Sequence, residues 1–165
     1  MGKVDGSRIV ENGNMSAVPP KRVLFVCIGN AYRSQMAEAF ARTLGRGLLV
    51  AESAGLSPVF ALPESTVSVM QEKGIDISAQ LPKPVIGLDV KSYDLIVNMT
   101  SLPVPSLPQA STRSWIVPDP VGQPDSVLRE VRDEIESLVM GLVLELRRRH
   151  EQRERPRLSP KLRGV

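Results

Sequence analysis

The chain has 165 residues, a formal net charge of +3, and a hydrophobic fraction of 42% with only 4% aromatic residues. This size and composition predict one domain whose core is built mainly from aliphatic side chains. The only cysteine is Cys27 and the only histidine is His150, which excludes an internal disulfide and argues against a Cys- or His-based metal site and a Ser/His or Cys/His hydrolase.

The charge is unevenly distributed along the chain. From Arg147 onward, eight Lys and Arg residues stand against two Glu residues, so this end carries +6 and the remainder carries −3. Such a block is typical of a solvated helix end, and an anionic surface is the alternative partner. The block lacks the interleaved aromatic residues that stack on bases, which disfavours nucleic acid. No apolar run approaches a membrane span and residues 1–20 have no signal-peptide core, so we expect no membrane partner and a cytoplasmic location.

The first half of the chain contains two strand patterns and two helix patterns. Residues 1–20 are rich in Gly, Asn, Ser and Pro and are interpreted as a disordered leader. Residues 21–28 form an apolar run typical of a buried strand. Residues 34–44 predict a helix that ends at the glycines following it. Next come a short strand at 48–51 and a helix at 63–73, which starts at a proline and stops at a glycine.

The second half predicts two more strands and the longest helix. The strands are expected at 93–99 and 115–117, with a proline-rich loop between them. Apolar residues at helical spacing predict a helix over 126–149. Four strands separated by helices or crossovers predict an α/β fold with a doubly wound, four-stranded parallel sheet and helices on both faces. We place the folded domain at 21–150 and a basic flexible tail at 151–165.

The segment from Cys27 to Ser34, CIGNAYRS, is the most informative motif. It joins the first strand to the first helix, and a tight Gly/Asn loop ahead of a helix N-terminus forms a cradle for an oxyanion. Arg33 can hold two oxygens at once, Gly29 allows close backbone approach, and Asn30 tolerates left-handed conformations. The candidate phosphate-binding residues are Ile28, Gly29, Asn30, Ala31, Tyr32 and Arg33.

Within this motif Cys27 is the candidate nucleophile. The loop N–H groups, the helix dipole and Arg33 all favour its thiolate form, and Ser34 is placed to donate a hydrogen bond to the sulfur. A phosphoryl group transferred to this sulfur needs its leaving group protonated, and because the chain lacks a usable histidine, a carboxylic acid is the natural donor among Asp, Glu, Lys and Tyr. Asp119, which follows a predicted strand between Pro118 and Pro120, is the candidate. The loops of Cys27 and Asp119 both follow strands, so both can lie at the edge where parallel sheets bind ligands.

The motif CIGNAYRSQMAEAF resembles the signature of the low-molecular-weight protein tyrosine phosphatase family, which also contains the thioredoxin-coupled arsenate reductases. Ser53-Ala54-Gly55 and Asp119-Pro120 are similar to two further family segments, and the resemblance spans residues 21–140. It implies a cysteinyl-phosphate intermediate, no metal and no other cofactor. It also implies that Cys27 is the nucleophile, that Arg33 binds phosphate, that Ser34 supports the thiolate, and that Asp119 is first acid and then base.

Several positions depart from the family pattern. Tyr32 stands where many family phosphatases carry a second cysteine, so we expect Cys27 to over-oxidise under peroxide. Val121 stands where tyrosine-specific members have an aromatic residue. Residues 69–78 resemble arsenate reductases more closely, yet those enzymes use further cysteines after the third strand, where this chain has Met99-Thr100-Ser101. Arsenate reduction would therefore need an external thiol or redox protein.

These observations predict a cysteine-dependent phosphatase acting on phosphomonoesters, with protein phosphotyrosine as one candidate substrate. The partners would be a phosphorylated protein or a small phosphomonoester, and inorganic phosphate or another oxyanion. The alternatives are an arsenate reductase coupled to an external thiol, and a non-catalytic module that binds phosphate or a phosphopeptide.

Overall fold

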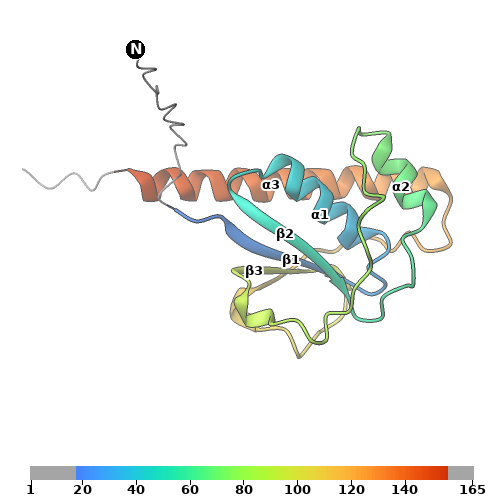
Figure 1. The fold of residues 1–165 in the computed structure, drawn as a ribbon, viewed down its shortest axis with the longest axis horizontal. Coiled ribbons are helices and arrows are strands. Elements are labelled where there is room, and N and C mark those ends of the chain that lie inside the picture. The colour runs from blue at the N-terminus through green and yellow to red at the C-terminus, as the bar shows by residue number, and fades with distance from the viewer. Residues whose placement is uncertain (1–17, 156–165) are drawn as a thin grey trace, which may run out of the picture.

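The computed structural model describes residues 18–155, so the predicted leader up to residue 17 and the tail from residue 156 lie outside the described residues. Figure 1 shows a twisted sheet with a long helix running along it. The sheet has four parallel strands in the order β2-β1-β3-β4. The strands are β1 (Lys21–Cys27), β2 (Leu49–Gly55), β3 (Leu95–Asn98) and β4 (Thr112–Ser114).

Three α-helices and two short 3₁₀ helices connect and cover these strands. They are α1 (Arg33–Leu44), α2 (Glu64–Gln71), η1 (Val90–Ser92), η2 (Gln109–Ser111) and α3 (Asp125–Glu154). The predicted α/β fold with a four-stranded parallel sheet is therefore confirmed. The α3 helix continues through Glu154, beyond the end expected near residue 149. No helix within residues 18–155 is long and apolar enough to cross a membrane.

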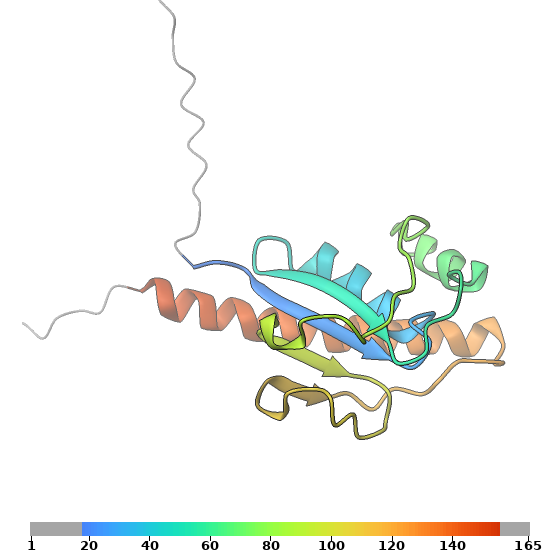
Figure 2. The ribbon, with the colours of Figure 1, turned by 60° about the horizontal axis from the view of Figure 1, so that its bottom comes forward.

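The two faces of the sheet are covered differently. On one face, Val23, Phe25 and Val97 pack with α1 and α3 into the larger core, and Figure 2 shows both helices on that side. On the other face, Leu24 and Ile96 pack under η1 and neighbouring loops. Helices thus lie on both faces, but the second face carries a 3₁₀ helix where the first carries α-helices. Because successive side chains in a strand alternate, Cys27 projects to the face of the α-helices.

The fourth strand differs from the prediction. We expected it at residues 115–117, but the ladder with β3 covers Thr112–Ser114. The apolar triplet remains extended, with Trp115 and Val117 buried and Ile116 84% exposed. Because β3 ends at Asn98, the triplet has no neighbouring strand beyond the bond from the Trp115 N–H to the Asn98 carbonyl, at 3.0 Å. The expected strand is wrong because apolar alternation reports burial and not pairing.

The second strand is longer than its apolar pattern predicts. We expected residues 48–51, and the strand runs from Leu49 to Gly55. Its polar residues are accommodated by specific partners. Glu52 accepts a hydrogen bond from the Tyr93 hydroxyl, and Ser53 donates to Glu38 on α1 at 2.5 Å. The partners of Glu52 and Ser53 lie 41 and 15 residues away along the chain, so the local sequence pattern does not reveal them. The predicted strand is therefore too short.

Candidate active site

The candidate site lies at the carboxyl edge of the sheet. Residues 28–32 leave the end of β1 and lead into α1, while Met99 follows β3 and Val117 follows β4. Cys27, Arg33 and Asp119 line one cavity of about 230 Å³, together with the apolar side chains of Val59, Pro63 and Val121. The topology therefore brings three of the four predicted catalytic residues to one cavity. The fourth, Ser34, does not line the cavity but contacts the sulfur of Cys27.

A chain of buried hydrogen bonds holds the sulfur. Cys27 Sγ lies 2.8 Å from Ser34 Oγ, and Ser34 is fully buried. Asn30 Nδ2 donates to Ser34 Oγ at 2.8 Å and to Ser53 Oγ at 2.9 Å. Ser53 donates in turn to Glu38. Four buried polar side chains thus form a continuous series of hydrogen bonds that starts at the sulfur of Cys27. In the interior, a polar group left without a partner would lower the stability of the fold.

The direction of these bonds follows from one backbone group. The Lys83 N–H needs an acceptor and finds Asn30 Oδ1 at 2.9 Å, so the amide NH₂ of Asn30 faces the two serines. With Asn30 donating to its oxygen, Ser34 keeps its own proton free for the sulfur. In this arrangement Ser34 can donate its hydroxyl proton to the sulfur of Cys27, 2.8 Å away.

Glu38 ends this chain and is nearly buried. Burial raises the pKa of its carboxyl above the ordinary value, while the hydrogen bond from Ser53 and the charge of Arg42 act in the opposite direction. Arg42 Nη2 lies 2.6 Å from Glu38 Oε1 one helical turn further along α1. Glu38 thus anchors the far end of the network against the helix.

Arg33 is held by the ends of two other strands. It is 4% exposed, and its Nη1 donates to the carbonyls of Met99 at 2.7 Å and Val117 at 3.2 Å. Its Nη2 donates to Asp119 Oδ2 at 3.2 Å. This leaves Nε and one N–H of Nη2 without a partner among residues 18–155. Since every fully buried side-chain nitrogen or oxygen of residues 18–155 has a partner, the unpaired Nε must be accessible, and Arg33 lines the cavity.

The loop backbone is also open to a ligand. Asn30 has φ of +47°, the left-handed conformation expected for it. Tyr32, at the N-cap of α1, provides no side-chain hydrogen bond to the helix. Within the described part of the chain, the N–H groups of Gly29, Asn30, Ala31 and Tyr32 donate to no protein acceptor. Such a run of free donors before a helix N-terminus is suited to a tetrahedral anion.

The segment after β2 supports this loop from outside. The N–H groups of Leu56, Ser57 and Val59 donate to the carbonyls of Cys27, Ile28 and Gly29, at 3.1, 2.8 and 3.0 Å. Gly55 is packed so closely that a Cβ there would lie 2.7 Å from the Ile28 carbonyl oxygen and 2.9 Å from the Asn30 nitrogen. The loop conformation therefore depends on a glycine at the end of β2.

The predicted phosphate-binding residues are not equivalent in the structure. Ile28, Gly29, Ala31, Tyr32 and Arg33 line the cavity, whereas the Asn30 side chain turns into the interior. Sequence reasoning did not assign roles to Glu38 and Ser53, which complete the network behind Cys27. It also missed Gln35, whose Nε2 donates to the Asn30 carbonyl at 3.0 Å, and Thr66, whose hydroxyl donates to the Ala31 carbonyl at 2.8 Å. Polar residues at fully buried positions were the available signal, but burial becomes visible only in the fold.

No group of three or more His, Cys, Asp or Glu residues within residues 18–155 could hold a metal ion. The site consists of a thiol, a hydroxyl, a guanidinium, a carboxylate and free backbone donors. This set can bind a tetrahedral oxyanion and carry out nucleophilic attack with proton transfer.

The family assignment rests on a match over nearly the whole described chain. Residues 22–152 match the model of the low molecular weight phosphotyrosine protein phosphatase family. The chain belongs to this family, as the resemblance of its loop predicted.

The most similar curated relatives include arsenate reductases. The chain is 36% identical over 130 residues to a glutaredoxin arsenate reductase from Synechocystis, covering 76% of this chain and 98% of that protein. It is 35% identical over 119 residues to an arsenate reductase from Staphylococcus aureus, covering 70% and 90%.

The solved structures of similar proteins include an arsenate reductase and a phosphatase. An arsenate reductase in the phosphate-binding state has 35% identity and a TM-score of 0.70, covering 76% of this chain and 98% of that one. An arginine phosphatase from Geobacillus stearothermophilus has 27% identity and a TM-score of 0.74, covering 83% and 99%. The family is thus established, and the particular reaction must be argued from the residues.

Proposed function

We propose that this chain is a cysteine-dependent phosphatase that hydrolyses phosphomonoesters through a cysteinyl-phosphate intermediate. The observation that carries the proposal is that Cys27, Arg33 and Asp119 share one cavity, with Asp119 held at the guanidinium of Arg33. A nucleophile, an anion-binding group and a proton donor are the complete requirement for this reaction.

The proposed reaction has two steps. Free loop N–H groups and the guanidinium of Arg33 hold the phosphoryl oxygens while Cys27 Sγ attacks phosphorus. The P–O bond to the leaving group breaks, and Asp119 gives that oxygen its proton. In the second step Asp119 takes a proton from water, the water oxygen bonds to phosphorus, and the P–S bond breaks to return the thiolate. Ser34 supports the sulfur when its negative charge returns.

The apolar lining of the cavity also indicates which leaving groups the site would accept. Its walls away from the loop are formed by Val59, Pro63 and Val121, and Phe60 beside them is fully exposed. An uncharged, largely apolar leaving group matches this lining, and phosphotyrosine in a protein is one such substrate.

Arsenate reduction is the second candidate, because the relatives described above include arsenate reductases. Arsenate is tetrahedral like phosphate, and Cys27 could form an S–As bond with loss of water. An external thiolate would then attack the sulfur, releasing arsenite and leaving a mixed disulfide, and a second external thiol would reduce that disulfide. Cys27 is the only cysteine of the chain, so both reducing thiols must come from outside. Phosphate hydrolysis needs no second thiol, which favours it.

The test compares both reactions on the same protein. Wild type, Cys27→Ser and Asp119→Asn are assayed with phenyl phosphate, whose leaving group needs a proton, and separately with arsenate plus glutathione and glutaredoxin. We expect phosphate release by wild type, its loss by at least about a thousandfold in Cys27→Ser, and a fall of about a hundredfold in Asp119→Asn.

Other outcomes separate the alternatives. Thiol-dependent arsenite formation without phosphate release would replace the phosphatase with the reductase. Phosphate binding without either reaction, measured by calorimetry, would leave a binding module.

A further inference from the structure

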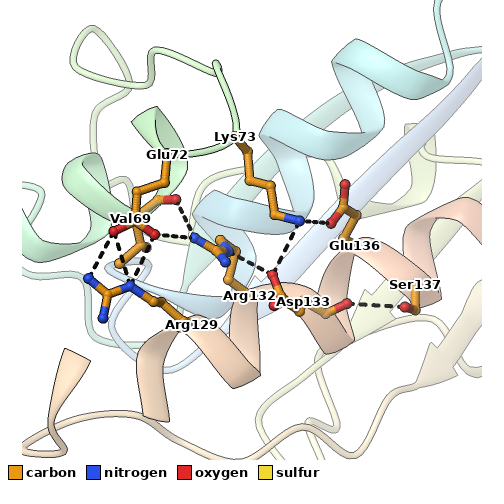
Figure 3. Close-up of polar contacts among 8 residues, drawn as sticks. All are labelled: Val69, Glu72, Lys73, Arg129, Arg132, Asp133, Glu136 and Ser137. Atoms are coloured by element: carbon orange, nitrogen blue, oxygen red, sulfur yellow. Dashed lines mark hydrogen bonds and ion pairs between the residues drawn. The ribbon is translucent and has the colours of Figure 1, made fainter. Parts of the chain in front are cut away.

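A cluster of ion pairs joins the C-terminal end of α2 to the first part of α3, and its residues do not line the cavity of Cys27. Figure 3 shows Glu72, at the C-terminal end of α2, between two arginines of α3. Glu72 accepts from Arg129 Nε and Nη2, at 3.0 and 2.9 Å, and from Arg132 Nη1 at 2.6 Å. Hydrogen bonds from Arg129 and Arg132 hold the pKa of the Glu72 carboxyl below its usual value.

Arg132 is the buried member of this cluster. Its side chain is 8% exposed, and Nη1 also donates to the Val69 carbonyl in the last turn of α2, at 2.9 Å. Its Nε donates to Asp133 at 2.8 Å. The guanidinium of Arg132 thus binds a carbonyl in the last turn of α2 and the side chain of Glu72, which follows that helix. The helix dipole favours a positive charge at this end of α2.

The helix α2 is also tied to the loop of Cys27. Thr66 is fully buried in α2, and its hydroxyl donates to the Ala31 carbonyl of the loop at 2.8 Å. Pro63, the N-cap of α2, lines the cavity. A displacement of α2 would therefore reach one wall of the site directly.

The beginning of α3 is connected just as closely to Asp119. The Val121 N–H donates to Asp119 Oδ1 at 3.1 Å, and the Gln123 N–H donates to the Pro120 carbonyl at 3.0 Å. Gly122 has φ of +71°, which suits the third position of a type II turn. Prolines restrict this connection further, at positions 118, 120 and 124. A shift of the α3 N-terminus would be passed to Asp119 by a stiff segment.

We propose that Glu72, Arg129 and Arg132 form a tie between α2 and α3 that sets the spacing of the Asp119 loop against the Cys27 loop. The three side chains touch neither substrate nor reacting atoms, and they act as positioning residues for proton transfer to the leaving group. This role rests on the proposed phosphatase function. Since misplacement of a catalytic group by a fraction of an ångström lowers its contribution, breaking the tie will weaken the step that uses Asp119.

The experiment uses Glu72→Ala, because Glu72 is a surface residue and Arg132 keeps its bonds to Asp133 and Val69. The matched control is Glu136→Ala, which removes the bond from Lys73 Nζ at 2.7 Å but leaves the tie intact and leaves Lys73 paired with Asp133 on α3 at 3.4 Å. Each variant is assayed with phenyl phosphate, whose leaving group needs a proton, and with p-nitrophenyl phosphate, whose leaving group needs it much less.

We expect Glu72→Ala to lower kcat/KM about tenfold for phenyl phosphate and less than about twofold for p-nitrophenyl phosphate. Glu136→Ala should match wild type on both substrates. In an Asp119→Asn background, Glu72→Ala should cause no further loss, because the proton donor that it positions is already absent.

Equal losses on the two substrates, or an undiminished loss in the Asp119→Asn background, would overturn the positioning role and leave the phosphatase proposal standing. A wild type that hydrolyses neither substrate would overturn both proposals. The two failures are therefore distinguishable.

Discussion

The polar side chains at the two ends of the sheet differ in their exposure to solvent. At the carboxyl end, Cys27, Arg33 and Ser34 are at most 4% exposed and are held by interior hydrogen bonds. At the amino end, under the second half of α3, Arg113 pairs with Glu145 at 2.9 Å and Arg149 pairs with the same carboxylate at 2.8 Å. The side chains of these two arginines are 40% and 66% exposed. Buried polar groups must be satisfied by fixed partners, whereas exposed ion pairs exchange easily with water.

This difference predicts unequal consequences of mutation. A change at the carboxyl end leaves an interior group without its partner and displaces the loop that carries Cys27. A change at the amino end leaves a charged side chain without its partner, but water already solvates that charge, so the loss of stability is small. The three substitutions below follow that order, from the largest expected effect to the smallest.

Removing the Asn30 side chain should have the largest effect. Asn30→Ala deletes the amide that orients Ser34 and Ser53, and it places a residue without a polar side chain at φ of +47°. We expect kcat/KM for p-nitrophenyl phosphate to fall about a hundredfold and stability to fall by about 2 kcal/mol, measured by urea denaturation.

The control for Asn30→Ala is Asn30→Gly, which relieves the backbone conformation and still lacks the amide. It should be more stable than Asn30→Ala and equally inactive. Near-normal activity in Asn30→Gly would mean that the loop conformation matters and the amide does not.

A methyl group at Gly55 should have an intermediate effect. In Gly55→Ala the new Cβ would meet the backbone of Ile28 and Asn30 at distances below 3.0 Å, so the loop must move. We expect a loss of about 2 kcal/mol in stability, together with a fall in kcat/KM for p-nitrophenyl phosphate.

Gly141 provides the matched control for Gly55. It lies in α3, and a Cβ added there meets nothing within 4 Å. Gly141→Ala should stabilise the protein by about 0.5–1 kcal/mol, because alanine is the better helix former, and it should leave activity unchanged. If Gly55→Ala were as stable and active as wild type, the close packing of β2 under the loop would not be a constraint.

Removing one charge at the amino end should have the smallest effect. Hydrogen bonds from Arg113 hold the pKa of Glu145 below its ordinary value of 4.5, despite partial desolvation. A lowered folded-state pKa contributes stability that is present above the unfolded value and is lost as pH falls through the folded value. Glu145→Gln should therefore cost about 0.5–1 kcal/mol at neutral pH, and the difference from wild type should vanish well below about pH 4.

Denaturation of both proteins across this pH range, at low and high salt, tests the prediction. Salt should reduce the difference at neutral pH, because the pair is partly exposed. A difference that stayed constant down to acidic pH would show that Glu145 contributes through packing and not through its charge.

The predictability of the site differed from residue to residue. Cys27, Arg33 and Ser34 could be assigned because a short segment between a strand and a helix contains all three, and their relative placement is local. Asp119 was predicted from the lack of a usable histidine, from its place after a strand between two prolines, and from the resemblance of Asp119-Pro120 to a family segment. The fold brings it to 3.2 Å from Arg33. Glu38 and Ser53 lie in segments that resemble the family, but no role could be assigned to them, since a glutamate on a helix and a serine in a strand are ordinary surface residues until both are buried.

The sequence by itself determined the class of fold, the family and the loop that contains Cys27, because strand periodicity and a contiguous motif are properties of neighbouring residues. Only the tertiary structure decided which partners surround that loop. The carbonyls that hold Arg33 come from residues 66 and 84 positions away, and the acceptor for Ser53 lies on a helix packed across the strand. The physical reason is that a buried hydrogen bond is specified by where two distant segments meet, and that meeting is a consequence of packing the whole chain.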